Sequence, residues 1–331
     1  TAPTGLWQEA STASRKGSFL VIGDWGFDYA CHGNVPQVQC QQVIADRMLE
    51  KFKELGDVKF IINVGDSFYP HGVASRSDPQ WRSKWREVYH EQLRSVPWYS
   101  VMGNHDYQHD PCACSTNIAD CAQVNADAGD LDHFYMPALS WFKEHPELDL
   151  EVVAMDTNHF MLGYMQNLGY EQHHFEDCQY SPCEQQCKTI AKTRAEEALE
   201  LFRERASKSA AKNLLVFSHY PTDYFTSRPE FLQGLRDASK HDILYFGGHR
   251  HNIDQTSTAS IAPNVNWLVG GGGGWSCDGQ NQGFLVGEIG MDKISTYPVL
   301  VDAAVCCRGV TPPSKWIGQG CEWLCCGKCI D

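Results

Sequence analysis

Short apolar segments that end in a glycine or a polar side chain recur along this chain. Residues 60–64 form one of them, rich in β-branched and aromatic side chains, and Gly65 and Asp66 follow directly. This pattern predicts a buried β-strand that stops at the glycine. Open α/β sheets bind ligands at the carboxyl ends of their strands, so Asp66 is expected to lie in such a crevice. Tyr69, three residues later, adds a second oxygen donor suited to a hard divalent or trivalent cation.

Four further predicted strands end in the same way, at residues 18–22, 98–102, 214–217 and 243–246. The metal-binding types of side chain after these five strands are Asp24, Asp66, Tyr69, Asn104, His105, His219, His249 and His251. A single histidine at a strand end usually makes only a hydrogen bond within its loop. Five such strand ends in one chain indicate instead that the side chains share a metal site.

The remaining apolar patterns predict how the strands are connected. Amphipathic spacing at residues 43–55 predicts a helix between the first two strands, which therefore pair in parallel. A packed helix is predicted at residues 81–89, a solvated surface helix at 189–207 and an antiparallel strand pair at 284–299. The five glycines at 270–274 open no helix, which excludes a dinucleotide-binding loop. We expect them to let the backbone pass close beneath the metal site.

Composition limits the kinds of partner. The formal net charge of −14 argues against nucleic acid or an anionic membrane, and the apolar runs are too short to span a bilayer. We predict an N-terminal arm at 1–17, one catalytic domain at 18–300 and a Cys-rich tail at 301–331, with further Cys-rich insertions inside the domain.

Fifteen cysteines favour disulfide bonds, and therefore a secreted or lumenal protein in an oxidising compartment. The alternative is a zinc site in the tail, where Cys326 and Cys329 have suitable spacing. The odd number of cysteines leaves one thiol free or bonded to a partner, for which the tail is the candidate.

In order, the strand ends read Gly-Asp-x-Gly, Gly-Asp-x-x-Tyr, Gly-Asn-His-Asp, Val-x-x-His and Gly-His-x-His. This series resembles the metallophosphoesterase superfamily, and within it the small, tartrate-resistant type of purple acid phosphatase. Most calcineurin-like members have Asp-x-His in the first motif, where this chain has Gly26. The missing histidine and the additional Tyr69 occur together, as in purple acid phosphatases. The resemblance implies an α/β fold, a β-sandwich of two mixed sheets flanked by helices.

The resemblance also implies a dinuclear centre of Fe(III) with a second divalent ion, Fe, Zn or Mn. Asp66 would bridge the ions, and His105 would protonate the leaving group or hold the phosphate. The remaining implied ligands are Asp24, Tyr69 and His251 on the ferric ion, and Asn104, His219 and His249 on the divalent ion. His71 and Arg250 are candidate substrate contacts, although each is equally compatible with a solvated position.

The implied function is that of an acid phosphatase in which a metal-bound hydroxide attacks a phosphomonoester. Its substrates would be small phosphomonoesters or phosphoproteins. Two alternatives remain at this point. One is a phosphodiesterase or nucleotide pyrophosphatase on the same scaffold, and the other is a surface binding protein that keeps the phosphatase fold.

Overall fold

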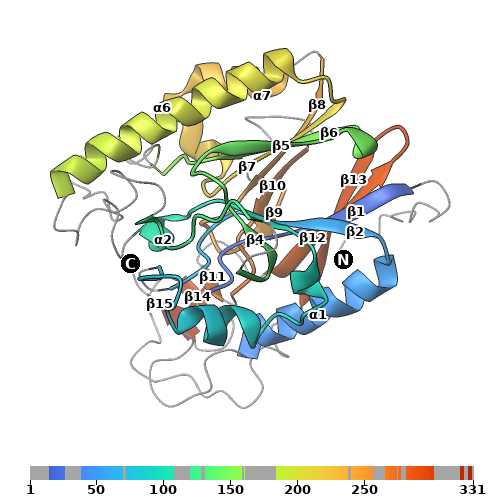
Figure 1. Cartoon of the computed structure of the whole chain (residues 1–331), viewed down its shortest axis with the longest axis vertical. Helices are drawn as coiled ribbons and strands as arrows, with labels where there is room; N and C mark the ends of the chain where they lie inside the picture. Colours follow the sequence, from blue (N-terminus) through green and yellow to red (C-terminus); the bar gives the residue numbers. More distant parts are fainter. Residues whose placement is uncertain are drawn as a thin grey trace.

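The computed structural model of the chain has two six-stranded mixed sheets packed face to face (Figure 1). It describes residues 15–26, 39–69, 72–107, 120–127, 131–158, 160, 184–237, 240–255, 265–273, 275–276, 281–301, 321–323 and 327–329. The N-terminal arm before Arg15, the insertion cysteines other than Cys40, Cys121 and Cys187, and most of the tail lie outside these residues, as does His71.

The first sheet carries the first three predicted strands. Its order is β13 (Ile294–Val301), β12 (Gln282–Gly290), β1 (Arg15–Ile22), β2 (Val58–Asn63), β3 (Trp98–Ser100) and β4 (Phe134–Tyr135). Strands β1, β2, β3 and β4 run parallel to one another, whereas β12 is antiparallel to both β1 and β13. The predicted parallel start and antiparallel hairpin are both confirmed.

The second sheet carries the later predicted strands. Its order is β5 (Trp141–His145), β6 (Leu150–Met155), β7 (Asn213–Ser218), β8 (Asp242–Gly247), β10 (Val265–Val269) and β9 (Ile253–Asp254). The four central strands are parallel, and β5 and β9 are antiparallel edges. A small third sheet joins β11 (Trp275–Ser276) to β14 (Cys321–Trp323) and β15 (Gly327–Cys329), so these tail strands pair with the segment after the glycine run.

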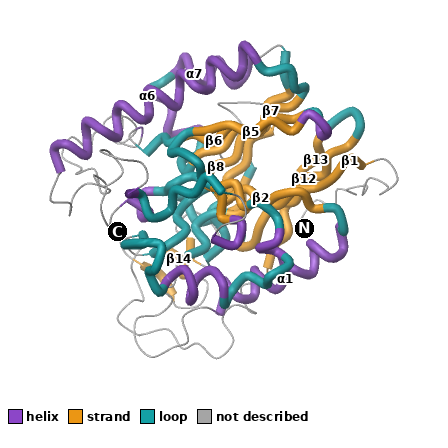
Figure 2. Tube along the Cα trace, viewed as in Figure 1, coloured by secondary structure: helices purple, strands orange, loops and turns teal. Residues whose placement is uncertain are grey.

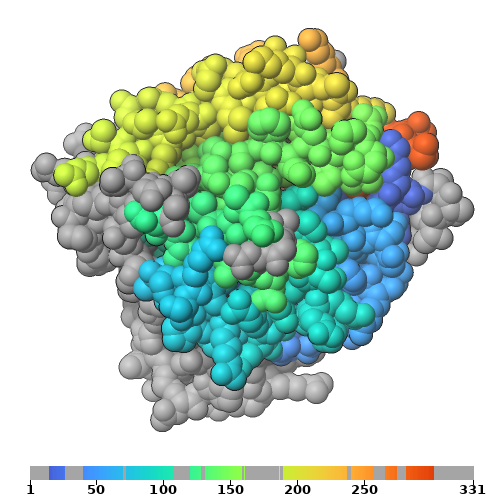
Figure 3. Space-filling view, viewed as in Figure 1, coloured from blue at the N-terminus to red at the C-terminus, as the bar shows by residue number. Residues whose placement is uncertain are grey.

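Helices cover the outer faces of the two sheets. Helix α1 (Gln39–Leu55) lies on the first sheet against β12 and β13, and α6 (Glu184–Lys208) with α7 (Pro229–Asp237) covers the second (Figures 1 and 2). In the space-filling view the yellow α6–α7 segment lies along the upper edge of the molecule (Figure 3). The other helical segments are short: η2 (Trp81–Arg86), η3 (Leu93–Ser95), α2 (Asn104–Tyr107), η5 (Leu131–His133), η6 (Pro146–Leu148) and η7 (Thr222–Ser227).

Two of the predicted helices differ from expectation. The packed helix near residue 81 is a short π-helix, η2, which buries Trp81 and Trp85. Helix α6 is not simply a solvated surface helix, because Ala198, Leu199 and Phe202 on one of its faces are buried against the second sheet. Because many residues on its other face are charged, the sequence alone does not reveal this apolar stripe. Among the described helices, none is both long and apolar enough to cross a bilayer.

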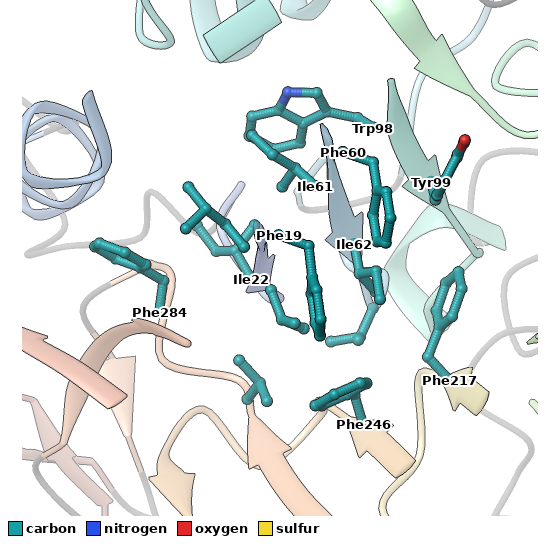
Figure 4. Close-up of a cluster of buried hydrophobic side chains, with 14 of the residues drawn as sticks. Phe19, Ile22, Phe60, Ile61, Ile62, Trp98, Tyr99, Phe217, Phe246 and Phe284 are labelled. Carbon is teal, nitrogen blue, oxygen red and sulfur yellow. The ribbon is translucent and has the colours of Figure 1, made fainter. Parts of the chain in front are cut away.

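The main core lies between the two sheets. Phe19 of β1 makes an edge contact with Phe246 of β8 at 6.1 Å between ring centroids, and Tyr99 of β3 does so with Trp141 of β5 at 5.4 Å. The close-up shows Phe19 and Ile62 of the first sheet pointing toward Phe217 and Phe246 of the second (Figure 4). Burying one such aromatic side chain contributes about 2–3 kcal/mol. This packing holds together the carboxyl edges of the two sheets, from which all the predicted metal ligands come.

Candidate metal centre

The predicted ligands sit on turns with unusual backbone geometry. The backbone φ angle is positive at Asp24, Asp66, His249 and His251, with values of 56°, 52°, 71° and 47°. Residues other than glycine rarely adopt this left-handed region. Such a conformation costs on the order of 1–3 kcal/mol per residue and is concentrated at functional sites. Four strained residues on three separate strand ends indicate that the fold holds these side chains in place against local preference.

Tyr69 is the centre of one group of ligands. Its hydroxyl oxygen lies 2.7 Å from Asp66 Oδ2, 3.0 Å from His251 Nε2 and 3.4 Å from Asp24 Oδ1. His251 Nε2 is also 3.2 Å from Asp24 Oδ1. All four side chains are buried. We call Asp24, Tyr69 and His251 the tyrosine half of the site.

A second group surrounds Asn104. Its side-chain oxygen lies 2.9 Å from His219 Nε2 and 3.0 Å from His249 Nδ1. We call Asn104, His219 and His249 the asparagine half. His219 Nε2 is also 3.4 Å from Asp66 Oδ2, the oxygen that Tyr69 contacts from the other side. Asp66 therefore lies between the two halves.

The hydrogen bonds of His219 show that this donor set fits a cation. Its Nδ1 lies 3.1 Å from the carbonyl oxygen of Val64, an acceptor, so Nδ1 carries the proton. A neutral ring then turns the lone pair of Nε2 toward the oxygens of Asn104 and Asp66, which are acceptors as well. These three acceptor atoms face one another in a buried position with no proton to share, and a metal ion bound between them would satisfy all three. Asp24, Asp66 and His219 offer ligand atoms that all lie within 4.8 Å of one another.

The charges of the site lead to the same conclusion. Burial lowers the pKa of His251 to about 3 and also lowers the pKa of His219 and His249, so the imidazoles are neutral and able to coordinate. Burial and the nearby charge of Asp66 raise the pKa of Asp24 well above its usual range. Burial and the same two carboxylates raise the pKa of the Tyr69 phenol. Negative charge on these buried oxygens is therefore unfavourable on its own, and a bound cation would neutralise it.

His105 is placed differently from the ligands. Its backbone N–H donates to Asp66 Oδ1 at 2.9 Å, and its ring lies over the ring of Tyr69 with 4.2 Å between centroids. The residue is only half-buried, whereas Asn104 next to it is buried. The imidazole therefore packs beside the tyrosine half of the site.

Asp106 is a site residue whose role the sequence does not predict. Its buried carboxylate accepts hydrogen bonds from the backbone N–H groups of Ser67, Phe68 and Gly103, and from the side chain of Gln123. It thereby ties the loop of Asp66 to the loop of Asn104. Its position within the Gly-Asn-His-Asp motif was the available signal, but only the fold shows which backbone groups it faces.

Two glycines fit the site because they lack a side chain. A Cβ atom on Gly270 would lie 2.7 Å from the backbone nitrogen of His251 and 2.8 Å from Asp24 Oδ2. The predicted close approach of the glycine run to the metal site is confirmed there. A Cβ on Gly26 would lie 2.0 Å from the carbonyl oxygen of Ser67, so no side chain fits where other phosphoesterases have a histidine.

The two candidate substrate contacts stay predictions. His71 lies outside the described residues. Arg250 lies between the two histidines of its motif, and its guanidinium forms an ion pair with Asp223 at 2.7 Å. A substrate phosphate would therefore have to share this arginine with Asp223.

The sequence of this chain also matches a known protein family and individual known proteins. Residues 17–252 match the family model of the calcineurin-like phosphoesterases. Purple acid phosphatase 3 of Arabidopsis thaliana is 28% identical over 277 residues, which cover 82% of this chain and 67% of that protein. Tartrate-resistant acid phosphatase type 5 of Oryctolagus cuniculus is 31% identical over 102 residues, 30% of each chain.

One solved structure is similar along most of its length. GAP50, described as the anchor in the inner membrane complex of Plasmodium, has a TM-score of 0.56 at 20% sequence identity and covers 86% of this chain and 84% of its own. At that identity the likeness concerns the fold alone. The sequence match and the geometry of the strand ends together show that the chain belongs to the calcineurin-like phosphoesterase family and has purple acid phosphatases among its homologues.

Proposed function

We propose that the protein is a metal-dependent acid phosphatase that hydrolyses phosphomonoesters at a dinuclear centre of Fe(III) and a divalent ion. The observation that carries the proposal is the position of Asp66, whose Oδ2 contacts Tyr69 in one half of the site and His219 in the other. A carboxylate in this position is suited to bridging two ions. Tyr69 and Gly26 together favour the purple acid phosphatase type over a phosphodiesterase or nucleotide pyrophosphatase.

Each half of the site would bind one of the two ions. Asp24, Tyr69 and His251 would hold the ferric ion, because anionic oxygens suit a hard trivalent cation. Asn104, His219 and His249 would hold the divalent ion, Fe, Zn or Mn. When bound, the two ions would supply Lewis acidity, which polarises the phosphoryl oxygens and acidifies a water molecule. Val64 orients the ring of His219 through its carbonyl, and Asp106 holds the loops of Asp66 and Asn104 together.

His105 is the proposed proton donor to the leaving alkoxide. It is half-buried and its ring packs against that of Tyr69, so the imidazole stands next to the ligands. An imidazole in this place is able to hand a proton to an ester oxygen that leaves the phosphorus. The substrate would be a small phosphomonoester or a phosphoprotein.

The compartment and the alternative function belong to the same proposal. Cys40 and Cys121, the two cysteines whose side chains the structure describes, are both disulfide-bonded, which favours a secreted or lumenal protein. A purely structural role as a surface scaffold is the competing interpretation. Retention of the seven ligand types and His105 in one cluster favours catalysis, since a scaffold has no use for buried carboxylates and strained turns.

Metal analysis of the purified chain, combined with a p-nitrophenyl phosphate assay across pH, tests the proposal. We expect two metal ions per chain, at least one of them iron, and a maximum of activity at acid pH. A protein that binds only zinc, or that reaches full activity with one ion, would contradict the assignment. A protein that binds both ions but cleaves diesters faster than monoesters would support the phosphodiesterase alternative.

A further inference from the structure

The carboxyl end of β6 lies next to the metal centre, although none of its residues is a predicted ligand. Met155 at the end of β6 pairs with Ser218 at the end of β7, so the segment 156–158 leaves the sheet beside His219. The side-chain amide of Asn158 donates to the carbonyl oxygen of Met102 at 3.1 Å, just before the loop of Asn104 and His105. Segment 156–158 is therefore held against the wall of the metal site.

Helix α6 adds an arginine to this segment. The hydroxyl of Tyr107, at the end of α2, donates to Asp156 Oδ2, and Asp156 Oδ1 accepts from both the backbone and the side chain of Asn158. Burial and the charge of Asp156 raise the pKa of Tyr107 well above its usual range, so it remains a donor. The guanidinium of Arg194 lies over the ring of Tyr107, 5.5 Å from its centroid.

Three buried polar atoms in this cluster are left without a hydrogen-bond partner in the described part of the chain. They are Thr157 Oγ1, Asn158 Oδ1 and Arg194 Nη2, on residues that are 1%, 2% and 8% exposed. Each orphaned group costs about 1–3 kcal/mol, and more when it is charged. Such groups are rare, and three of them on residues connected through Tyr107 and Asp156 call for a ligand.

The chemistry of the three atoms defines the ligand. Thr157 and Arg194 offer an O–H and an N–H donor, and arginine is always charged, so together they suit an oxyanion. Among the residues described here Arg194 interacts with the hydroxyl of Tyr107, but its Nη2 has no hydrogen-bond partner. Both oxygens of Asp156 are occupied by Tyr107 and Asn158. The free acceptor of Asn158 adds a place for a hydroxyl or N–H group of the same molecule.

We propose that Thr157 and Arg194 form a subsite for an acidic group, phosphate or carboxylate, carried by the leaving alcohol of the substrate. The inference rests on the proposed function, since it places the reacting phosphate at the metal centre and the second acidic group on the adjoining segment of β6. The subsite makes the enzyme selective for phosphomonoesters with a second negative charge close to the scissile ester. Arg194 and Thr157 bind this group and take no part in the chemistry.

The test compares three substrates that differ only in their acidic groups: glycerol 2-phosphate, 2-phosphoglycerate and 2,3-bisphosphoglycerate. In the full-length, metal-loaded protein, Arg194→Gln should lower kcat/KM for the two acidic substrates by roughly 10–100-fold, mainly through KM, the range for one charge-assisted hydrogen bond. The loss on glycerol 2-phosphate should be at least tenfold smaller. If the loss in kcat/KM is the same for 2-phosphoglycerate and 2,3-bisphosphoglycerate, the subsite binds the carboxylate. If the loss is larger for 2,3-bisphosphoglycerate, the subsite binds the second phosphate.

Two further variants keep the test decisive. Thr157→Val preserves the shape of the side chain and should reduce the same preference by a smaller factor, even if Arg194→Gln folds poorly. Arg203→Gln, on the same helix but with a 55% exposed side chain, is the matched control and should change nothing. An equal loss on all three substrates, or no loss with Arg194→Gln and Thr157→Val, overturns the subsite.

Failure of the proposed function would give a different result. If none of the three esters is hydrolysed, the subsite is measured by the thermal shift that 2,3-bisphosphoglycerate and glycerol 2-phosphate produce in the metal-loaded protein. A larger shift with 2,3-bisphosphoglycerate that disappears in Arg194→Gln and survives in Arg203→Gln supports the subsite without the activity. Equal shifts in the wild type and in Arg194→Gln contradict it.

Discussion

The tyrosine half and the asparagine half of the metal centre are built from different donors on similar turns. The tyrosine half contributes a carboxylate, a phenol and one imidazole, and the asparagine half contributes an amide and two imidazoles, with Asp66 between them. Negative oxygens favour a trivalent ion, and neutral nitrogens with an amide favour a divalent one. The comparison shows how one fold can place two unlike sets of donors on either side of a single carboxylate. Four substitutions test how far the two halves are independent.

Asp66→Ala should have the largest effect because it removes the side chain that both halves share. We expect the loss of metal from both positions and a fall in activity of roughly 10⁴-fold or more, since the chemistry depends on the paired ions. Elemental analysis and the p-nitrophenyl phosphate assay measure both quantities. If Asp66→Ala kept one ion at full occupancy, the halves would be more independent than a bridge allows.

His105→Ala should come next, with turnover reduced by roughly 10²–10⁴-fold, the range for losing a general acid. Metal content should stay intact, because His105 contacts Asp66 through its backbone N–H and not through its ring. The loss should be greater for alkyl phosphates than for p-nitrophenyl phosphate, whose leaving group needs little protonation. An equal loss on both substrates would mean that His105 only positions the phosphate.

Gly270→Ala should disturb the tyrosine half and spare the asparagine half. The new methyl group would collide with the backbone of His251 and the carboxylate of Asp24, and overpacking of this kind costs about 1–3 kcal/mol. We expect activity to fall roughly 100-fold through displaced ligands, together with a lower melting temperature. Gly290→Ala, in the β12–β13 hairpin, is a control for the mutation type, and a similar effect on activity there would refute the local explanation.

The close approach of Gly270 to the metal site could be predicted from the sequence, whereas other features of the site could not. Alternation of apolar segments and polar strand ends identified the parallel strands and placed Asp66, Asn104 and His219 near one another. That inference works because strand polarity brings all carboxyl ends to one edge. The role of Asp106 and the cluster around Arg194 could not be predicted in this way, because they depend on which loops and helices meet across the two sheets. The buried face of α6 was missed for a related reason: Ala195 and Ala198 are small residues in a highly charged helix and add little to its apolar signal.

Tyr69→Phe should have the smallest effect on activity, although its spectroscopic effect should be complete. If the phenolate binds Fe(III), ligand-to-metal charge transfer gives the wild-type protein a broad visible absorption, a purple or pink colour. Without a metal, burial and the charges of Asp66 and Asp24 keep the phenol protonated, because its pKa lies well above the usual range. Colour therefore requires a cation strong enough to displace that proton.

The mutant removes the oxygen and keeps the buried ring, so the stacking on His105 and the fold should survive. Asp24, Asp66 and His251 still surround the position, and we expect activity to fall only about tenfold, a change of about 1.4 kcal/mol in the barrier. Absorption spectra of iron-loaded wild type and Tyr69→Phe, recorded beside the activity assay, measure both outcomes. A colourless but active iron-loaded wild type would mean that Tyr69 is only a packed aromatic whose hydroxyl meets Asp66. The two halves would then differ much less than their side chains suggest, and only the broader phosphoesterase function would stand.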